Sequence, residues 1–508
     1  MKSKQLHTGF YGHPRPLKGL FLTELWERFS FYGIRPLLIL YMTAFIFQGG
    51  MQMSRAEASA LVGLFAGSVY FMTILGGWLA DHYLGQIRAV YIGAILMSIG
   101  HFCIALNAFF SSTFFYLGLV FIALGSGLFK TCIAVIVGLL YQEADQRRDS
   151  GFLIFYTGIN IGSFIAPLIT GLLAEHINWH AGFIAGGLGM LCSMLIFRFY
   201  CIKQLKNFNQ DLISNNGLDS PISPHPYAAK LIYGLVTILI FLIIAVHQAW
   251  ITLHPIFLSR YLTISIVTTV FIYFGYMLFF AGLTFHEKTK IILCFILLMA
   301  AALFWSAFEQ TYTVFNLFAL EHTNRNLFNF QIPTIWFQSI NPLFVITLSP
   351  VLAWVWTALA KRHYYLTHLS KFILALLFAT AAFLVLAFAC QSLLNSQQSH
   401  PLASPWWLVS SFFLLTLGEL CLSPIGLSAM TELAPDKLRG QIMGLWCTAI
   451  AIGNLCAGLM GSEILAQSFN EMSGLLYRYS LILLIGAILL FILKFPLNKM
   501  LAKPSRCG

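Results

Sequence analysis

The hydrophobic pattern of this 508-residue chain is a series of apolar stretches that recur from end to end, with short polar segments between them. Each stretch is about 20 residues long, which is the length a helix needs to cross a lipid bilayer. Fourteen spans are predicted, at residues 18–47, 56–80, 88–110, 113–140, 150–173, 180–200, 228–252, 256–283, 290–319, 333–359, 370–392, 405–430, 438–465 and 474–495. The pattern therefore predicts an all-α polytopic membrane protein.

Composition and charge support this class. Hydrophobic residues make up 59% of the chain and charged residues only 9%, and the mean hydropathy is +0.80. The net charge of +11 does not indicate a nucleic-acid partner, because most of the 29 Lys and Arg residues lie on segments expected inside the cell. Four basic residues fall on outer segments: Arg55, Arg260, Arg325 and Arg478. We therefore expect a multi-pass protein of the plasma (inner) membrane with both termini cytoplasmic and an uncleaved first helix.

The spans are grouped as six, two and six. We expect an N-terminal six-helix bundle at 1–202, a cytoplasmic linker at 203–227, an extra helix pair at 228–289 and a C-terminal six-helix bundle at 290–508. This is the layout of the major facilitator superfamily with two additional helices, and it predicts a substrate site at the midplane between the halves. The stretch GGWLADHYLGQIR at 76–88 agrees, because it has the superfamily's acidic, glycine and basic positions in a short inner loop.

Seven ionisable side chains remain inside the predicted spans after the surface charges are set aside. They are Arg28, Arg35, Lys130, Glu24, Glu27, Glu309 and Glu419. In the first span Glu24, Arg28 and Arg35 share one stripe of a helix with Phe31, so this stripe is expected to line a cavity. Four acids against three bases leave one carboxylate that could bind and release a proton. Static ion pairs that only lock helices together are the alternative.

Several polar groups stand alone in later spans. Lys130 needs an anion, either Glu419 or the carboxylate of a substrate. Trp305 and Glu309 are expected at i and i+4 on one face of the span at 290–319, and Glu419 lies near a kink predicted at Pro424. None of the ten cysteines has the CxxC spacing of a metal or redox site, so neither a metal nor a disulfide framework is expected.

Two asparagines are further candidates for contact with a substrate. Asn160 lies between Gly158 and Gly162, a spacing that close helix packing explains as well as a ligand role does. Asn341 precedes Pro342, where a freed backbone group and an amide could meet a substrate.

Five stretches of the chain together resemble the proton-dependent oligopeptide transporter family, a branch of the major facilitator superfamily. They are ELWERFSFYG, FYTGINIGSFIAPLITG, FWSAFEQ, WFQSINPLF and GELCLSPIGLSAMTELAPDKLRG. They occur in the family's order and cover both halves, and the fourteen spans resemble its prokaryotic members. Four positions depart from the pattern. Phe31 replaces the first Tyr of the signature, and Gly63 aligns with a histidine of animal relatives. Thr131 follows Lys130 where many members have Pro, and Cys447 replaces an aromatic residue that some relatives have beside Trp446.

The resemblance implies roles for the substrate-binding residues. Arg35 and Lys130 would attract the carboxylate of a peptide, and Glu419, Asn160 and Asn341 would receive its amino end. The cavity walls would be Tyr32, Tyr70, Trp305 and Trp446.

The resemblance also implies how protons are coupled. Glu309 would be a proton-binding carboxylate that alternates between a proton and Arg35. The first-helix network that couples protonation to peptide binding would be Glu24, Glu27 and Arg28. Two opposed pairs would hold the halves together: Arg35 with Glu309, and Lys130 with Glu419.

The expected function is a proton-coupled symporter that imports di- and tripeptides by alternating access. Protons would be the coupling ion with no other cofactor, and the protein would function as a monomer without a nucleic-acid partner. A carrier of another small zwitterionic or drug-like solute remains an alternative. A passive channel or sensor on the same scaffold is a further alternative. A membrane enzyme is not expected, because the buried acids are scattered over three distant helices and no HxxxD-type box occurs in a loop.

Overall fold

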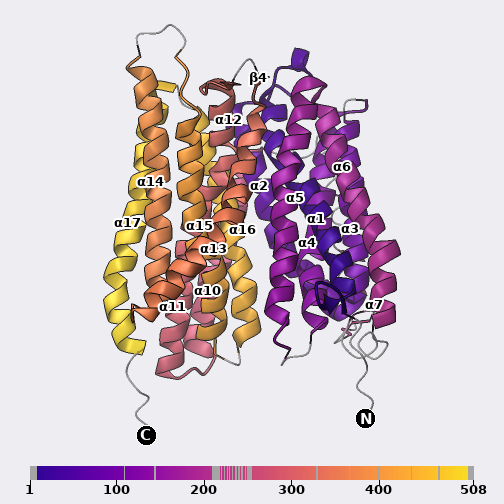
Figure 1. The fold of residues 1–508 in the computed structure, drawn as a ribbon, viewed down its shortest axis with the longest axis vertical. Helices are drawn as coiled ribbons and strands as arrows, with labels where there is room; N and C mark the ends of the chain where they lie inside the picture. The colour runs from indigo at the N-terminus through magenta and orange to yellow at the C-terminus, as the bar shows by residue number, and fades with distance from the viewer. Residues whose placement is uncertain are drawn as a thin grey trace. The chain divides into compact units, whose positions relative to one another are not determined.

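The structure is a computed structural model that describes residues 8–208 except 108 and 142–144, isolated positions between 218 and 254, and residues 255–501 except 328–329, 365, 397–400, 436–437 and 467–468. The described residues form helices apart from two short antiparallel hairpins (Figure 1). The chain divides into two compact units. The first comprises Met1–Leu37, Ile46–Gly50 and Ser68–His254, and the second comprises Leu38–Phe45, Met51–Gly67 and Pro255–Gly508.

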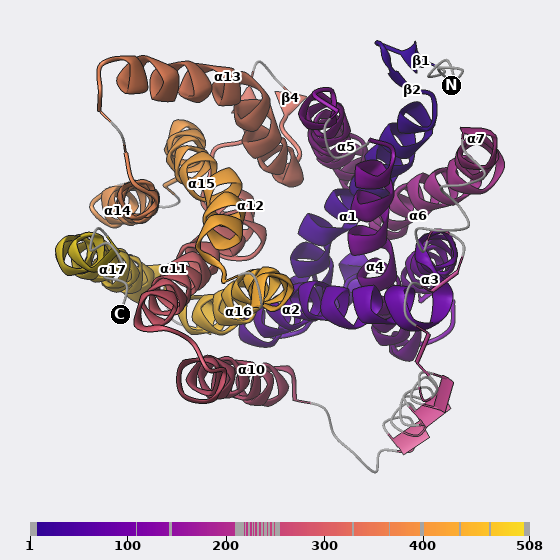
Figure 2. The ribbon, with the colours of Figure 1, turned by 90° about the horizontal axis from the view of Figure 1, so that it is seen from below.

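The N-terminal part of the chain forms a hairpin followed by long helices. Its elements are β1 (Thr8–Phe10), β2 (His13–Pro14), α1 (Pro16–Thr43), η1 (Ile46–Gln48), α2 (Arg55–Leu79), η2 (Ala80–Leu84), α3 (Gln86–Leu106), α4 (Ser112–Leu139), α5 (Arg148–His176), α6 (Trp179–Leu195), η3 (Ile196–Cys201) and α7 (Ile202–Phe208). Figure 2 shows that α3 and α4 lie side by side, and they make the most extensive helix contact in the first unit.

The C-terminal part is also helical. Its elements are α10 (Pro255–Phe280), α11 (Phe285–Phe308), η4 (Glu309–Tyr312), α12 (Val314–Glu321), β3 (Asn326–Leu327), β4 (Phe330–Gln331), η5 (Thr334–Ser339), α13 (Ile340–Lys361), α14 (His368–Leu394), α15 (Trp406–Leu433), α16 (Arg439–Ala466) and α17 (Phe469–Leu501). In Figure 2, α14 lies beside both α15 and α17, and these contacts build the core of the second unit.

Twelve helices of the described residues are long and apolar enough to cross a membrane. Helix α1 is 28 residues long as well, but the buried charges it contains separate it from those twelve. The span predicted at 228–252 falls largely outside the described residues, so the count of fourteen stays a prediction. The predicted class is confirmed: the chain is an all-α, multi-pass membrane protein.

One predicted span is broken. The sequence pattern predicts an unbroken helix over 290–319, but α11 ends at Phe308 and the 3₁₀ turn η4 separates it from α12. The turn coincides with buried polar residues, and the Gln338 side chain donates a 2.6 Å hydrogen bond to the Thr311 carbonyl. A side-chain donor can satisfy a backbone carbonyl that a helix break frees, so the break is tolerated at membrane depth. Glu309 caps the last turn of α11, where its N–H donates to the Trp305 carbonyl, so the break begins just after the predicted i, i+4 pair.

The inner loop predicted at 76–88 is also shorter than expected. Helix α2 continues as the π-helical segment η2 to Leu84, and a single residue, Gly85, connects it to α3. Gly85 has φ of +79°, a conformation that glycine adopts without steric cost. The Gln86 side chain donates a 2.8 Å hydrogen bond to the Asp81 carboxylate, and this bond links the two sides of the turn.

Glycines allow the helices of the first unit to approach closely. A Cβ atom built on Gly93 would lie 2.6 Å from the Gly125 carbonyl oxygen, and one built on Gly125 would lie 2.6 Å from that of Gly93. Gly100 and Gly118 form a second such pair between α3 and α4. Association of helices in lipid depends on close van der Waals packing, so these small residues determine how tightly α3 and α4 pack.

Replacing Gly125 by Ala should destabilise the protein by about 1–3 kcal/mol, because the added methyl group overlaps the backbone of α3. The matched control is Gly275→Ala in α10, where an added Cβ meets no atom within 4 Å. This control should be neutral or slightly stabilising. The thermal unfolding midpoint of the purified protein in detergent checks both variants. Equal midpoints for the two would contradict the packing argument.

The N-terminal hairpin docks on the connection between α4 and α5. Its turn places Tyr11 and Gly12 at positive φ, as a tight two-residue hairpin requires. The Arg147 guanidinium donates to the Gly12 carbonyl at 3.0 Å, and His13 Nδ1 lies 2.9 Å from the Tyr141 hydroxyl. Burial and then the Arg147 charge lower the pKa of His13, while the nearby Asp145 carboxylate opposes them. The docked hairpin therefore favours a neutral imidazole.

Acidification should loosen this hairpin. A folded-state pKa below the ordinary value of 6.5 means that the undocked His13 binds protons more readily, so docking is complete above that pH and weakens as the pH falls below it. Hydrogen exchange of residues 8–14, corrected for its intrinsic pH dependence, should be faster at about pH 5 than at about pH 8. His13→Gln should remove the difference. Exchange that keeps its pH dependence in this variant would contradict the assignment to His13.

Candidate functional site

The charged stripe on α1 is a compact network within the first unit. Arg28 Nε donates to Glu24 Oε1 at 2.7 Å and lies 3.2 Å from Glu27 Oε2. Glu24 is 1% exposed and Glu27 is fully buried. One guanidinium therefore serves two carboxylates away from water, and the three groups together hold a net negative charge when both acids are ionised. Such a group can exchange a proton without losing all of its pairing.

Helix α5 presses against this network through glycine. A Cβ atom on Gly162 would lie 2.3 Å from the Leu25 carbonyl oxygen and 3.1 Å from the Arg28 side chain. Gly158 similarly faces Phe21. Between them, Asn160 is buried and its Nδ2 donates to the Tyr156 carbonyl at 3.0 Å. The two glycines thus serve helix packing, while a ligand role of Asn160 stays a prediction.

Lys130 of α4 and Arg35 of α1 supply two more positive charges to the first unit. Lys130 Nζ lies 3.8 Å from the centroid of the Phe31 ring and 5.4 Å from that of Tyr70. Arg35 Cζ lies 5.8 Å from the Phe31 ring centroid. Tyr32 packs edge-on against Phe31 with ring centroids 5.4 Å apart. The predicted cationic residues and two predicted wall residues are therefore gathered around one aromatic side chain.

The second unit brings together Asn341 and Glu419. Asn341 lies in the first turn of α13, and its Nδ2 donates to Glu419 Oε2 at 2.8 Å and to Thr416 Oγ1 at 3.0 Å on α15. Thr416 did not stand out in the sequence, because a threonine in an apolar span usually bonds its own helix. It does so here too, donating to the Phe412 carbonyl at 2.7 Å. The arrangement holds a carboxylate oxygen beside an oriented amide.

The remaining predicted residues of the second unit are firmly packed. Glu309 is 4% exposed and lies at the junction of α11 and η4. Trp305 packs against Gly453, and Trp446 packs against Gly426. The contact of Trp446 is made by its indole ring, and that of Trp305 by its Cβ and backbone. The predicted pairs of Arg35 with Glu309 and of Lys130 with Glu419 join residues of different units, and they stay predictions.

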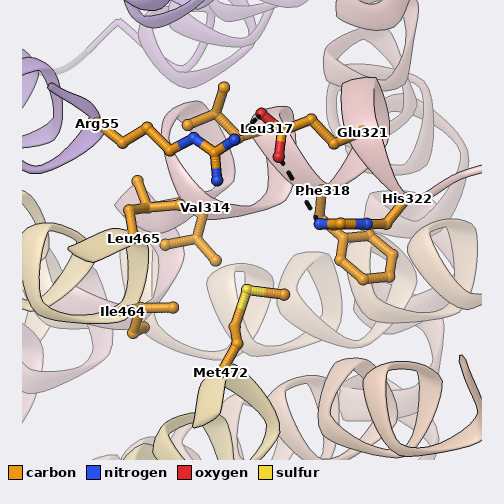
Figure 3. A pocket seen from close by; sticks show the side chains of 9 residues that line it. All are labelled: Arg55, Val314, Leu317, Phe318, Glu321, His322, Ile464, Leu465 and Met472. Carbon is orange, nitrogen blue, oxygen red and sulfur yellow. Dashed lines mark ion pairs between the residues drawn. The ribbon is translucent and has the colours of Figure 1, made fainter. Parts of the chain in front are cut away.

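A cluster that the sequence analysis missed lies where α2 begins and α12 ends. Figure 3 shows Arg55, Glu321 and His322 beside a cavity of the second unit. Arg55 Nη2 lies 2.9 Å from Glu321 Oε1, and His322 Nε2 lies 3.7 Å from Glu321 Oε2. Burial and the Arg55 charge lower the pKa of His322 to about 4, so Arg55 is the cation of the cluster at neutral pH. The sequence did contain a signal for this ion pair: Arg55 directly precedes the predicted span at 56–80, and Glu321 lies just past the predicted span at 290–319.

Comparison with known proteins decides the family. The POT family profile matches residues 87–473. The chain belongs to the POT family. This membership makes it a membrane transporter and not an enzyme. A peptide transporter, YePEPT, of Yersinia enterocolitica subsp. palearctica is 49% identical over 492 residues, which cover 97% of this chain and 96% of the relative.

Two further relatives support the membership of this POT transporter. A di-/tripeptide transporter of Lactococcus lactis subsp. cremoris is 35% identical over 456 residues, covering 87% of each chain. The crystal structure of a mutant of the peptide transporter POT in complex with alafosfalin has a TM-score of 0.87, with 33% identity and 98% of each chain covered. The predicted major facilitator fold is thereby confirmed.

Removing Arg28 should strongly destabilise the transporter. In Arg28→Met two buried carboxylates lose their cation, at a cost of about 3–5 kcal/mol. Adding Glu24→Gln and Glu27→Gln should restore most of the thermal unfolding midpoint, since no unpaired charge then remains.

The neutral triple variant also separates the two interpretations of this network. If Glu24, Glu27 and Arg28 only lock helices together, the stable triple variant should retain proton-driven transport. We expect it to lose that transport while its folding and solute binding persist. Full accumulation of solute by the triple variant would establish static ion pairs as the correct interpretation.

Proposed function

We propose that this POT transporter is a proton-coupled symporter that imports di- and tripeptides by alternating access. One observation supports this most: each unit presents half of the chemistry that a zwitterion needs. The first unit has a buried ammonium, Lys130, with no hydrogen-bond partner among the described residues. The second has the Glu419 carboxylate oriented by Asn341. Relatives that are named peptide and di-/tripeptide transporters favour a peptide as the zwitterion.

The charged ends of the peptide would be bound by these groups of opposite sign. Lys130 and Arg35 are cations that would bind the terminal carboxylate by charge-assisted hydrogen bonds. Glu419 would accept hydrogen bonds from the terminal ammonium, assisted by Asn341 and Asn160. Aromatic walls make few demands on side chains, which suits a carrier of many peptides. The proposed walls are Tyr32, Tyr70, Trp305 and Trp446.

Protons would be the coupling ion, as is typical of the family, with no metal or other cofactor. Glu309 is the proposed site of exchange with a proton, because it is a buried carboxylate where α11 breaks. The network of Glu24, Glu27 and Arg28 would link its protonation to peptide binding.

The setting of the protein follows from charge and span order. We propose an inner (plasma) membrane location with cytoplasmic termini, because the basic residues concentrate on one side. The proposed organisation is an N-terminal bundle at 1–202, a linker at 203–227, an extra helix pair at 228–289 and a C-terminal bundle at 290–508. A monomer would suffice for transport, since one chain contains both poles.

Transport of another small zwitterionic or drug-like solute is the alternative on the same fold. It is favoured by the same two poles, which recognise separated charges and not the peptide bond between them. A competition series would decide between these solutes: dipeptides, tripeptides, peptides blocked at either end, and a non-peptide zwitterion of equal length. Peptides that compete only when both ends are free would support the peptide proposal.

The central test is uptake of labelled dialanine into liposomes that contain the purified full-length chain. An imposed inward proton gradient should drive accumulation above equilibrium. Glu309→Gln should abolish that accumulation but retain counterflow of labelled for unlabelled peptide, because binding persists while proton exchange is lost. Glu471→Gln, at an exposed position near the start of α17, is the matched control and should behave as wild type.

Each outcome of this test has a clear meaning. No gradient-driven accumulation by the wild type would contradict peptide symport. Accumulation without any counterflow would indicate a channel. Unimpaired accumulation by Glu309→Gln would remove Glu309 from the proton pathway while leaving symport intact.

A further inference from the structure

The ammonium group of Lys130 rests on aromatic rings and not on a carboxylate. Its Nζ lies 3.8 Å from the centroid of the Phe31 ring, close to the ring face, and 5.4 Å from the centroid of Tyr70. Phe31 is completely buried, so its position is set by the surrounding protein. Both rings and Lys130 belong to the first unit. The geometry is that of a cation–π contact with a buried ammonium nitrogen.

The nearby carboxylates form their ion pairs with Arg28 and give Lys130 no hydrogen bond. Glu24 and Glu27 both pair with Arg28 at 2.7 Å and 3.2 Å. Lys130 Nζ has no hydrogen-bond partner among the described residues. Among the described residues, the contacts recorded for its ammonium are therefore with the rings of Phe31 and Tyr70.

A phenyl ring can attract an ammonium group while leaving its N–H donors available to bind an anion. The ring attracts the positive charge through its quadrupole but has no lone pair of its own that accepts a directed hydrogen bond. The ammonium N–H groups on the side away from the ring stay available. A phenol at position 31 would add an oxygen able to compete for them, and this chain has phenylalanine there.

We propose that Phe31, assisted by Tyr70, is the positioning residue that seats Lys130 and so sets the affinity for the terminal carboxylate of the substrate. This inference rests on the proposed function. It adds a specificity role for an apolar side chain that touches Lys130 and acts through it. The ring orients the ammonium and supplies no counter-charge.

Competition binding tests the proposal on the purified full-length protein in nanodiscs, with dialanine and its C-terminal amide as the two probes. Phe31→Leu removes the ring and should weaken dialanine binding by about 10- to 30-fold, the scale of a buried cation–π contact, with little change for the amide. Phe31→Tyr keeps the π face and should restore most of the discrimination. Tyr70→Leu should reduce the discrimination between the two probes less than Phe31→Leu does, because the Tyr70 ring is farther from Lys130 Nζ.

Two controls separate positioning from general damage. Phe129→Leu removes an equally buried phenyl ring from the residue next to Lys130, within the hydrophobic core, and should alter both affinities by the same factor. In a Lys130→Gln background, where the cation is absent, Phe31→Leu should have no further effect on the ratio of the two affinities.

Several results would overturn the inference. One is an unchanged ratio of the two affinities in both Phe31→Leu and Tyr70→Leu. Another is an effect of Phe31→Leu that persists in full without Lys130. If the wild type binds neither dialanine nor its amide, the proposed function itself fails. If the wild type and both ring variants prefer dialanine over its amide to the same extent, the positioning role of Phe31 and Tyr70 is refuted, while the proposed function stands.

Discussion

An ionised side chain away from water must have a compensating partner, and this requirement organises the charged interior of the protein. The pairing of Arg28 with Glu24 and Glu27 is its clearest expression, since one guanidinium contacts two carboxylates in a helix surrounded by protein. Bulk water solvates such charges well, whereas lipid and protein interior do not. The stripe on α1 can therefore exist only where neighbouring helices enclose it.

Glycines in the neighbouring helices make that enclosure possible. Gly158 and Gly162 bring the backbone of α5 against α1 at the level of the charges, and Gly93 with Gly125 does the same between α3 and α4. A side chain at these positions would push the helices apart and admit lipid or water. Stability and charge burial are thus coupled through the same contacts.

The two units satisfy their polar groups incompletely and in different ways. In the second unit Asn341 donates to Glu419, which leaves the carboxylate oriented and still able to accept further hydrogen bonds. In the first unit Lys130 is stabilised by rings that leave its N–H groups available. A fully satisfied network would only add rigidity, whereas groups with unused hydrogen-bonding capacity can bind a solute and release it again.

The sequence by itself determined the membrane class, the approximate spans, the charged stripe on α1 and the family, because hydrophobic length, helical period and short motifs are local properties of the chain. Tertiary structure alone decided that α11 ends at Phe308 and that the Gln338 side chain donates a hydrogen bond to the Thr311 carbonyl in the turn that follows. It also decided that Asn341 meets Glu419, that Lys130 lies over Phe31, and that Arg55 pairs with Glu321. These contacts join residues far apart in the chain, so no local period encodes them. They depend on how whole helices rotate and pack against one another.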